Sequence, residues 1–298
     1  MSIKVLNISK SYKALKAIDS VSFEVNKGEL FGLIGPDGAG KTTLFRILTT
    51  LLLANEGTAS VLDFDVVKDY KSIRNSVGYM PGKFSLYQDL TVEENLTFFA
   101  TIFGTTIQEN YDLIKDIYVQ IEPFKNRRAG ALSGGMKQKL ALCCALIHAP
   151  KVLFLDEPTT GVDPISRKEF WEMLQRLKQK DITILVSTPY MDEASLCDRI
   201  ALIQNGKVLK IDSPENIIQN YDKVIYDVAT KNTHSLIHDL KNYQSQHSVY
   251  AFGEYAHYTD KENNFDTINL EKYLRAKNHT DIEIKPAQIT IEDVFMDL

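Results

Sequence analysis

The residue types best suited to chemistry stand in a glycine-rich segment near the start of the chain. Positions 35–42 read GPDGAGKT and fit the pattern G-x-x-x-x-G-K-[ST]. Glycines let successive backbone N–H groups converge on a phosphate without a Cβ in the way, and a helix that begins after the loop adds its positive N-terminal end. We expect Lys41 to neutralise phosphate charge and the Thr42 hydroxyl to bind Mg²⁺. An ordinary glycine turn followed by a chance Lys-Thr pair is the alternative. The expected phosphate-binding residues are Gly35, Pro36, Asp37, Gly38, Ala39, Gly40, Lys41, Thr42 and Thr43.

Two carboxylates follow an apolar run further along the chain. Positions 152–157 read VLFLDE, which is typical of a buried parallel strand that ends in acidic residues. Asp156 is suited to hold the hydration shell of Mg²⁺, and Glu157 is suited to polarise an attacking water as a general base. An acidic pair after a strand can equally be the N-cap of a helix. The phosphate loop favours the catalytic interpretation, with Thr42 and Asp156 as the metal ligands.

A third motif narrows the field, because few phosphate-binding proteins carry it. Positions 132–138 read LSGGMKQ, which resembles the LSGGQ signature of ABC ATPases, about 20 residues before the acidic pair. Ser133, Gly134 and Gly135 open a helix that we predict over Met136–Ala149, so they could present N–H groups and a hydroxyl to a phosphate. The resemblance implies that this phosphate belongs to a nucleotide held by the opposite subunit. A plain helix N-cap is the other interpretation, and the two are compatible.

The resemblance extends over about residues 2–215, with the motifs in the expected order. It implies that Tyr12 stacks on adenine, that residues 160–164 (TGVDP) form the D-loop at a dimer interface, and that residues 84–96 contact a membrane subunit. Residues 186–194 (VSTPYMDEA) match the switch segment after the last core strand. The sequence is most similar to ATPase subunits of bacterial multidrug or polysaccharide exporters, in segments that include SLYQDLTVEENL, CDRIALIQNGKVL and the ending ITIEDVFMDL.

Two positions depart from the family pattern. Gly82 stands where the Q-loop glutamine is expected, and Pro189 stands where the switch histidine is expected. The glutamine usually touches Mg²⁺ or the lytic water, and the histidine usually hydrogen-bonds the γ-phosphate, whereas glycine has no side chain and proline has no donor. We transfer neither role to Gln88 or to His148. The loop and the two carboxylates remain, so we expect ATP binding to survive and hydrolysis to be slow.

Hydrophobic patterning places these motifs on strands and helices. Residues 84–150 are predicted to form a helical insertion, within which Thr91 is an N-cap and Glu94 completes a capping box. Asn205-Gly206 is predicted to close a hairpin between residues 199–204 and 207–211. The other predicted strands are 3–8, 21–25, 29–34, 151–157 and 181–188, and the other predicted helices are 42–53 and 166–180.

Composition limits the classes of function that are possible. The chain has 298 residues, is 44% hydrophobic and has a formal net charge of -5, without the basic excess of a nucleic-acid-binding domain. We find no signal-peptide pattern and no apolar stretch of the roughly 18–20 residues that a membrane helix needs. The three cysteines lack metal-binding spacing, and Cys143 and Cys144 are predicted to be buried thiols in a helix. We therefore expect a cytoplasmic protein that reaches a membrane only through a spanning partner.

These observations together predict an α/β fold with two domains. Residues 1–220 would form a P-loop NTPase core of the ABC type, with a mixed sheet and a helical subdomain at about 84–150, and residues 221–298 a small accessory or regulatory α+β domain. The resemblance implies an ATPase that uses ATP and Mg²⁺, pairs with a second ATP-binding subunit as a homo- or heterodimer, and drives a transmembrane permease from the inner face of the cell membrane. Two alternatives stay open: a nucleotide-gated regulatory module with little turnover, and a soluble ABC-type ATPase.

Overall fold

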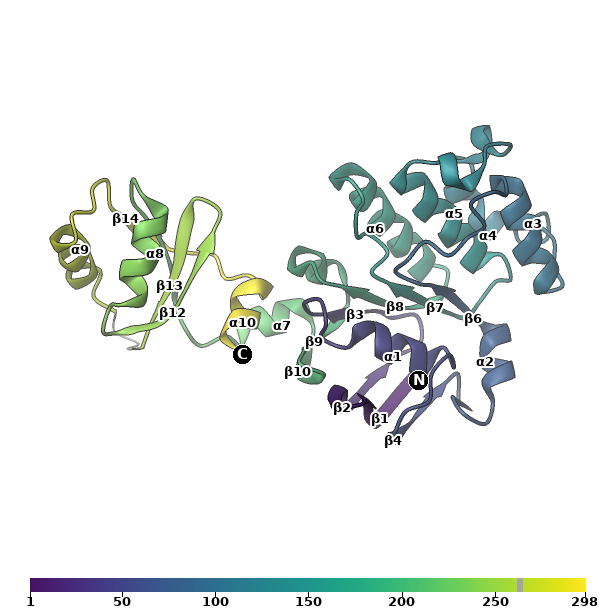
Figure 1. Cartoon of the computed structure of the whole chain (residues 1–298), viewed down its shortest axis with the longest axis horizontal. Coiled ribbons are helices and arrows are strands. Elements are labelled where there is room, and N and C mark those ends of the chain that lie inside the picture. The colour runs from purple at the N-terminus through teal and green to yellow at the C-terminus, as the bar shows by residue number, and fades with distance from the viewer. Residues whose placement is uncertain (262–264) are drawn as a thin grey trace. The chain divides into compact units, whose positions relative to one another are not determined.

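The computed structural model describes residues 1–261 and 265–298. The chain divides into two compact units, Met1–Pro214 and Glu215–Leu298 (Figure 1). The division falls at the start of helix α7 (Pro214–Gln219). The predicted domain boundary at residue 220 falls at the end of the same helix.

The central sheet of the first unit has six strands in the order β10-β9-β3-β8-β7-β6. All neighbouring strands are parallel except β9 and β10, which form the predicted hairpin. Asn205 and Gly206 both have positive φ, at 50° and 77°, as a tight hairpin turn requires. The strands β3, β7 and β8 are buried along their whole length, because helices cover both faces of this sheet (Figure 1). The strands are β3 (Leu30–Ile34), β6 (Val77–Met80), β7 (Val152–Asp156), β8 (Thr183–Thr188), β9 (Arg199–Gln204) and β10 (Lys207–Asp212).

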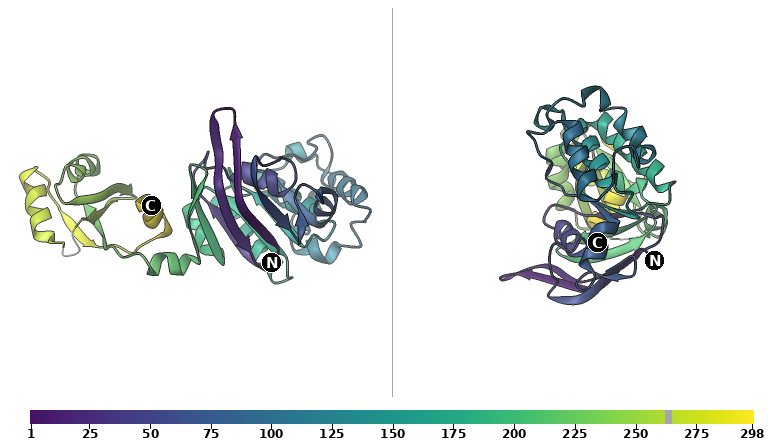
Figure 2. Two further views of the ribbon diagram at one scale, coloured as in Figure 1. Left: turned by 90° about the horizontal axis from the view of Figure 1, so that it is seen from below. Right: turned by 90° about the vertical axis from the view of Figure 1, so that its right-hand side faces the viewer.

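A second, antiparallel sheet packs with the central one around helix α1 (Lys41–Leu48). Its strands run in the order β2-β1-β4-β5, and the long hairpin of β1 and β2 projects from the unit (Figure 2). Leu44, Phe45 and Leu48 of α1 lie fully buried in one cluster with apolar residues of both sheets. The core therefore fixes the start of α1, and with it the phosphate loop. The strands are β1 (Ile3–Tyr12), β2 (Leu15–Val25), β4 (Glu56–Val61) and β5 (Phe64–Asp65).

Helix α1 is shorter than its leucine spacing predicts. It was expected over residues 42–53, but it ends at Leu48, and Thr50 has a φ of 65°. The N–H groups of Leu51 and Leu52 both donate to the carbonyl of Arg46, at 2.7 and 3.0 Å. These hydrogen bonds end the helix in a turn that contains Thr50, whose backbone is left-handed. Apolar spacing continues past this point without helical backbone, so the prediction was wrong at its C-terminal end.

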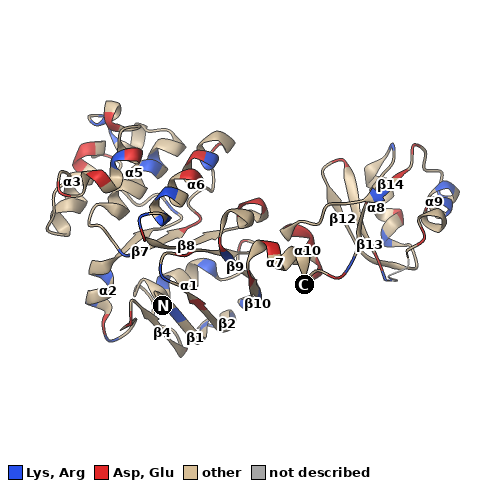
Figure 3. Cartoon of the chain, turned by 180° about the vertical axis from the view of Figure 1, so that it is seen from behind, with Lys and Arg blue, Asp and Glu red and all other residues tan. Residues whose placement is uncertain are grey.

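The helical block predicted at 84–150 is present and gathers on one side of the first unit (Figure 1). Thr91 caps α3 as predicted: its hydroxyl accepts from Glu94 N at 3.2 Å, and the Glu94 carboxylate accepts from Thr91 N at 2.8 Å. Cys143 and Cys144 are buried in α5, also as predicted. The charged residues of α5 are Lys137 and Lys139, whereas helix α6 (Pro164–Lys178) carries charges of both signs, as expected of a helix with one face toward water (Figure 3). Helix α2 (Tyr70–Ser76) precedes this block, whose elements are α3 (Val92–Ile102), α4 (Tyr111–Tyr118), the 3₁₀ helices η1 (Glu122–Phe124) and η2 (Ala129–Ala131), and α5 (Gly134–Leu146).

Two more helical segments of the first unit follow strands of the central sheet in the sequence. Helix α6 (Pro164–Lys178) connects β7 to β8 and begins two residues before the predicted start at Ser166. Asp163 caps it by accepting from Ser166 N at 3.0 Å. The 3₁₀ helix η3 (Met191–Leu196) follows β8. Among the described residues, none of the helices combines the length and the apolar character needed to cross a bilayer.

The second unit is an antiparallel sheet with helices. Its four strands run in the order β12-β13-β11-β14, and apolar residues of helices α8 and α9 pack against one face. This core includes Val228, Leu236, Tyr258 and Leu270, all fully buried. The elements are β11 (Ile225–Ala229), α8 (Thr233–Lys241), β12 (Gln246–Phe252), β13 (Tyr255–Asp260), α9 (Thr267–Ala276), β14 (Glu283–Pro286) and α10 (Ile291–Asp297).

Helix α10 is held to this unit by buried polar contacts. Asp293 is fully buried, closes a capping box with Thr290, and accepts hydrogen bonds from the Tyr250 hydroxyl and from His257 Nδ1. His257 Nε2 lies 3.1 Å from Asp227. Burial alone would raise the pKa of Asp293, but the hydrogen bonds from Thr290, Tyr250 and His257 hold that pKa below its ordinary value.

The attachment of α10 should therefore be lost in acid. A carboxylate whose pKa is lowered in the folded state stabilises the fold above its ordinary pKa of 3.8, and this contribution disappears as the pH falls through the lowered value. We expect hydrogen exchange at α10, corrected for its intrinsic pH dependence, to become faster below pH about 4 as this local stability is lost. Asp293→Asn should remove most of this pH dependence, and an unchanged profile in that variant would contradict the assignment.

Candidate functional site

The glycine-rich loop joins β3 to α1, and its backbone needs its glycines. Gly38 and Gly40 have φ of 80° and 102°, a region that other residues rarely adopt. A Cβ at Gly35 would lie 2.0 Å from the carbonyl oxygen of Ile203, and one at Gly40 would lie 2.4 Å from that of Ala17. Helix α1 starts without a side-chain cap and without an acidic residue in its first turn. Its first N–H groups are thus available to an anion such as a phosphate.

Lys41 lies over this loop and reaches the predicted base. Its side chain is buried, and Nζ donates to the carbonyl oxygens of Gly35 at 2.7 Å and Pro36 at 3.0 Å. Nζ also lies 3.0 Å from Glu157 Oε1. The structure therefore brings the predicted phosphate-binding lysine and the predicted general base into one site, although 116 positions separate them in the sequence.

Asp156 and Glu157 stand at the carboxyl end of β7, beside the loop. Asp156 is fully buried, and its Oδ1 accepts from the Ser187 hydroxyl at 2.7 Å. The same hydroxyl oxygen accepts from Glu157 N at 3.0 Å. Glu157 has a φ of 50°, a strained conformation for a residue with a side chain, and such strain is found preferentially at functional sites. Burial, and after it the negative charge of Asp156, raise the pKa of Tyr79 to about 12, so Tyr79 stays neutral.

Ser187 is a residue of the candidate site that the sequence alone did not identify. It faces Asp156 across the parallel strands β7 and β8 and orients that carboxylate together with the backbone of Glu157. The sequence did hold one indication, because Asp156 and Ser187 both lie near the ends of predicted central strands. Only the strand register, which the sequence does not state, pairs them.

Both departures from the family pattern lie at the site. A Cβ at Gly82 would be 3.0 Å from the carbonyl oxygen of Asp156 and 3.8 Å from Cβ of Glu157. Pro189 follows Thr188, the last residue of β8, whose carbonyl oxygen accepts from Gly35 N at 3.2 Å. The backbone at positions 82 and 189 thus runs beside the carboxylates and the phosphate loop, respectively.

Two other predicted groups, Tyr12 and Ser133, have their own contacts elsewhere in the first unit. Tyr12 is at the end of β1 in the projecting hairpin, is 42% exposed, and has Lys10 Nζ 5.9 Å from its ring centre. Ser133 caps α5 by accepting from Met136 N at 3.4 Å, so the N-cap interpretation holds. No hydrogen bond or ion pair found among residues 1–261 and 265–298 joins either side chain to Lys41.

The signature glycines pack instead against the region of the D-loop. A Cβ at Gly134 would be 3.6 Å from the carbonyl oxygen of Gly161, and one at Gly135 would be 2.6 Å from Ser166 Oγ. The small residues therefore allow α5 to approach the start of α6 closely.

The residues present are of the types that would fit Mg²⁺ and the phosphates of ATP. Thr42 offers a hydroxyl and Asp156 a carboxylate, the hard oxygen ligands that Mg²⁺ takes together with waters and phosphates. The loop offers backbone N–H groups and one buried ammonium to phosphate oxygens. Mg²⁺ supplies charge neutralisation when it is bound with ATP.

Comparisons with known proteins point to one family. A family model described as ABC transporter matches residues 18–160. The chain is 41% identical over 217 residues to the probable multidrug ABC transporter ATP-binding protein YbhF of Escherichia coli, which is 72% of this chain and 38% of the relative's length. It is 32% identical over 302 aligned positions to the Nod factor export ATP-binding protein I of Sinorhizobium fredii, covering 100% of this chain and 86% of that protein.

Solved structures of the same family share the fold of this chain. A structure described as an ATP binding subunit of an ABC transporter superposes with a TM-score of 0.67 at 28% identity, over 74% of this chain and 92% of that one. The predicted mixed sheet with a helical subdomain is thereby confirmed. From its motifs, its fold and its relatives alike, the chain belongs to the family of ABC transporter ATP-binding proteins, the ATPases of ABC transporters.

Proposed function

We propose that this chain is the ATP-binding and ATP-hydrolysing subunit of an ABC exporter and that it drives a separate membrane permease. The observation that carries the proposal is the 3.0 Å contact between Lys41 Nζ and Glu157 Oε1, which joins the phosphate loop to a carboxylate suited to activate water. The relatives named for multidrug and Nod factor export support the exporter role. In this proposal Thr42 and Asp156 hold Mg²⁺, and Tyr12 stacks on the adenine.

A second ATP-binding subunit belongs to the same proposal. Ser133, Gly134 and Gly135 lie at the N-terminus of α5, which is suited to a phosphate that the chain's own loop does not hold. Two such chains, or this chain and a different one, would each complete the other's nucleotide site.

A groove in the first unit is the proposed contact for the permease. It has a volume of about 300 Å³ and a mostly apolar lining, and it includes the expected contact residues Ser85 and Leu86. Phe99, Phe103 and His148 line the same groove, as do Met80 and Pro81 just before Gly82. A permease segment seated there would press on the strand end beside Asp156 and would hold the subunit at the inner face of the cell membrane.

We further propose that hydrolysis is slow. Gly82 places no amide near Asp156 and Glu157, and Pro189 places no donor near the phosphate loop. Loss of one positioned donor commonly costs about 2.7–4 kcal/mol at a charged transition state. The same two residues favour the second candidate function, a regulatory module that binds ATP with little turnover. The unit at 215–298 would be an accessory or regulatory domain in either case.

The proposal is tested by replacing Lys41. Lys41→Ala should weaken binding of a fluorescent ATP analogue about 100-fold, because it removes the buried ammonium that meets the phosphates. Lys4→Ala, which removes an exposed ion pair with Glu24, is the control and should bind as the wild type does. Equal binding by Lys41→Ala and the wild type would contradict the nucleotide site.

The exporter role is tested separately. The chain would be expressed with its neighbouring genes and purified by a tag, and we expect a membrane-spanning protein to co-purify. Recovery of ribosomes or DNA in its place would contradict the transporter assignment.

A further inference from the structure

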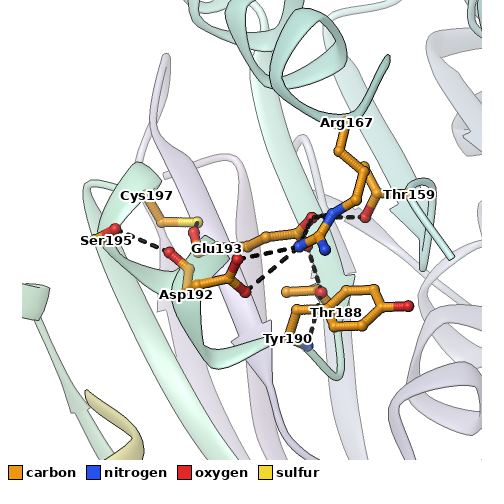
Figure 4. A network of polar contacts seen from close by, with 8 residues as sticks. All are labelled: Thr159, Arg167, Thr188, Tyr190, Asp192, Glu193, Ser195 and Cys197. Atoms are coloured by element: carbon orange, nitrogen blue, oxygen red, sulfur yellow. Dashed lines mark hydrogen bonds and ion pairs between the residues drawn. The ribbon is translucent and has the colours of Figure 1, made fainter. Parts of the chain in front are cut away.

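A buried carboxylate outside the expected nucleotide-binding residues joins several of their segments. Glu193 lies in η3, and 2% of its side chain is exposed. Its Oε1 accepts from Thr159 Oγ1 at 2.8 Å and from Arg167 Nε at 3.1 Å, and its Oε2 accepts from the Thr188 hydroxyl (Figure 4). Burying a carboxylate this deeply is costly unless donors such as these replace its lost hydration. We call Thr159, Arg167, Thr188 and Glu193 the Glu193 cluster.

Thr188 connects the Glu193 cluster to the phosphate loop. Its carbonyl oxygen accepts from Gly35 N at 3.2 Å, and its hydroxyl oxygen accepts from Tyr190 N at 3.0 Å. The residues on both sides of Pro189 are therefore held by hydrogen bonds, although Pro189 itself has no N–H group to donate. Glu193 thus helps to hold this segment through the Thr188 hydroxyl.

Thr159 connects the same carboxylate to the predicted general base. It is fully buried and stands two residues after Glu157. Thr160 N donates to the carbonyl oxygen of Glu157 at 3.2 Å, which closes a turn around Thr159. Strained backbone such as that of Glu157 persists only when its surroundings over-determine it. The bond from Thr159 to Glu193 is one of those constraints.

Arg167 balances the charge of the cluster from helix α6. Its guanidinium lies 3.0 Å from Glu193 Oε1, stacks 4.1 Å from the ring centre of Tyr190, and reaches the exposed Asp192 at 3.3 Å. A cavity of about 420 Å³ beside it is lined by Arg167, Trp171 and other residues of α6 and η3. One cation and two hydroxyls thus fix a single anion between three segments.

We propose that Glu193 is a positioning residue for ATP hydrolysis, which holds the turn carrying Glu157 in register with the phosphate loop. This inference rests on the proposed ATPase function. Among the described residues, Glu193 is linked to the site through Thr159 and Thr188, so its loss should move the general base without removing a contact to nucleotide. The expected signature is a fall in turnover with little change in ATP affinity.

The test compares Glu193→Gln and Thr159→Val with a matched control in the full chain. Single-turnover ATP cleavage with protein in excess, the Kd of a fluorescent ATP analogue and the thermal unfolding midpoint are measured for each. Glu172→Gln is the control, since it makes the same substitution at an exposed residue of the same cavity. We expect Glu193→Gln to slow cleavage about 10- to 100-fold, because small misplacements of reacting groups have effects of this size.

The other variants distinguish positioning from general stability. Thr159→Val should slow cleavage in the same direction, and the double variant should be no slower than Glu193→Gln, because both remove one hydrogen-bonded unit. Cleavage by Glu193→Gln at the wild-type rate would overturn the inference. So would a parallel loss of rate, affinity and thermal midpoint, which would indicate a purely structural role. Wild-type cleavage no faster than that of Lys41→Ala would overturn the proposed function itself.

Discussion

Replacing Glu157 with glutamine is expected to lower ATP turnover about 10²- to 10⁴-fold, the usual contribution of a positioned general base. Glutamine keeps the size and the backbone conformation of residue 157 but cannot take a proton from water. ATP binding should persist or become tighter, because the substitution removes the anion that now pairs with Lys41 at 3.0 Å. The ammonium would then be free of a competing carboxylate and could meet the phosphates at lower cost.

The measurement is the turnover number alongside the Kd for ATP in the same preparation. Glu169→Gln, which breaks an ion pair with Lys139 and has a half-exposed carboxylate, serves as the control and should leave both quantities near their wild-type values. Turnover that survives Glu157→Gln would remove the general-base role from this residue. A joint loss of turnover and binding would show that Glu157 supports the loop rather than the chemistry.

Restoring the two missing family residues should have the opposite effect. Gly82→Gln combined with Pro189→His is expected to raise turnover about 10²- to 10³-fold, the amount that one positioned donor commonly supplies, since two such gains need not add. Gly82 does not have left-handed backbone, so a side chain fits its conformation. Its new Cβ would lie 3.0 Å from the Asp156 carbonyl oxygen, which requires a shift of a few tenths of an ångström.

Matched control variants separate the effect of the added side-chain donors from the effect of the changed backbone. Gly82→Ala adds the same Cβ without an amide, and Pro189→Ala restores an N–H without an imidazole. Neither should approach the rate of the Gln and His variants. If the Gln and His variants are no faster than their alanine counterparts, slow turnover does not arise from these two positions.

The sequence predicted the strand, loop and helix around the phosphate site because their signals are local. A buried apolar run, a glycine pattern and a lysine follow one another between residues 29 and 42, and the Asn205-Gly206 turn needs only its own two residues. The capping box of Thr91 and Glu94 is equally local. The family resemblance supplied the assignments that spacing could not, such as the roles of positions 82 and 189.

What could not be predicted depends on pairing across long separations. Ser187 gains its role only because strand register places it opposite Asp156. In the sequence, Glu193 is one acidic residue in a polar stretch. Its role becomes apparent only in the structure, where Thr159 and Arg167 donate hydrogen bonds to it. The early end of α1 is similar, since the carbonyl of Arg46 decides it rather than the leucine pattern.

Trp171 has a practical consequence that follows from its place beside the Glu193 cluster. It is the only tryptophan among 298 residues, it is nearly fully buried in α6, and it lines the same cavity as Arg167. Selective excitation of indole would therefore report on the first unit alone, while the second unit contributes only tyrosine emission. The chain thus carries an intrinsic, label-free optical probe next to the residues proposed to align its chemistry.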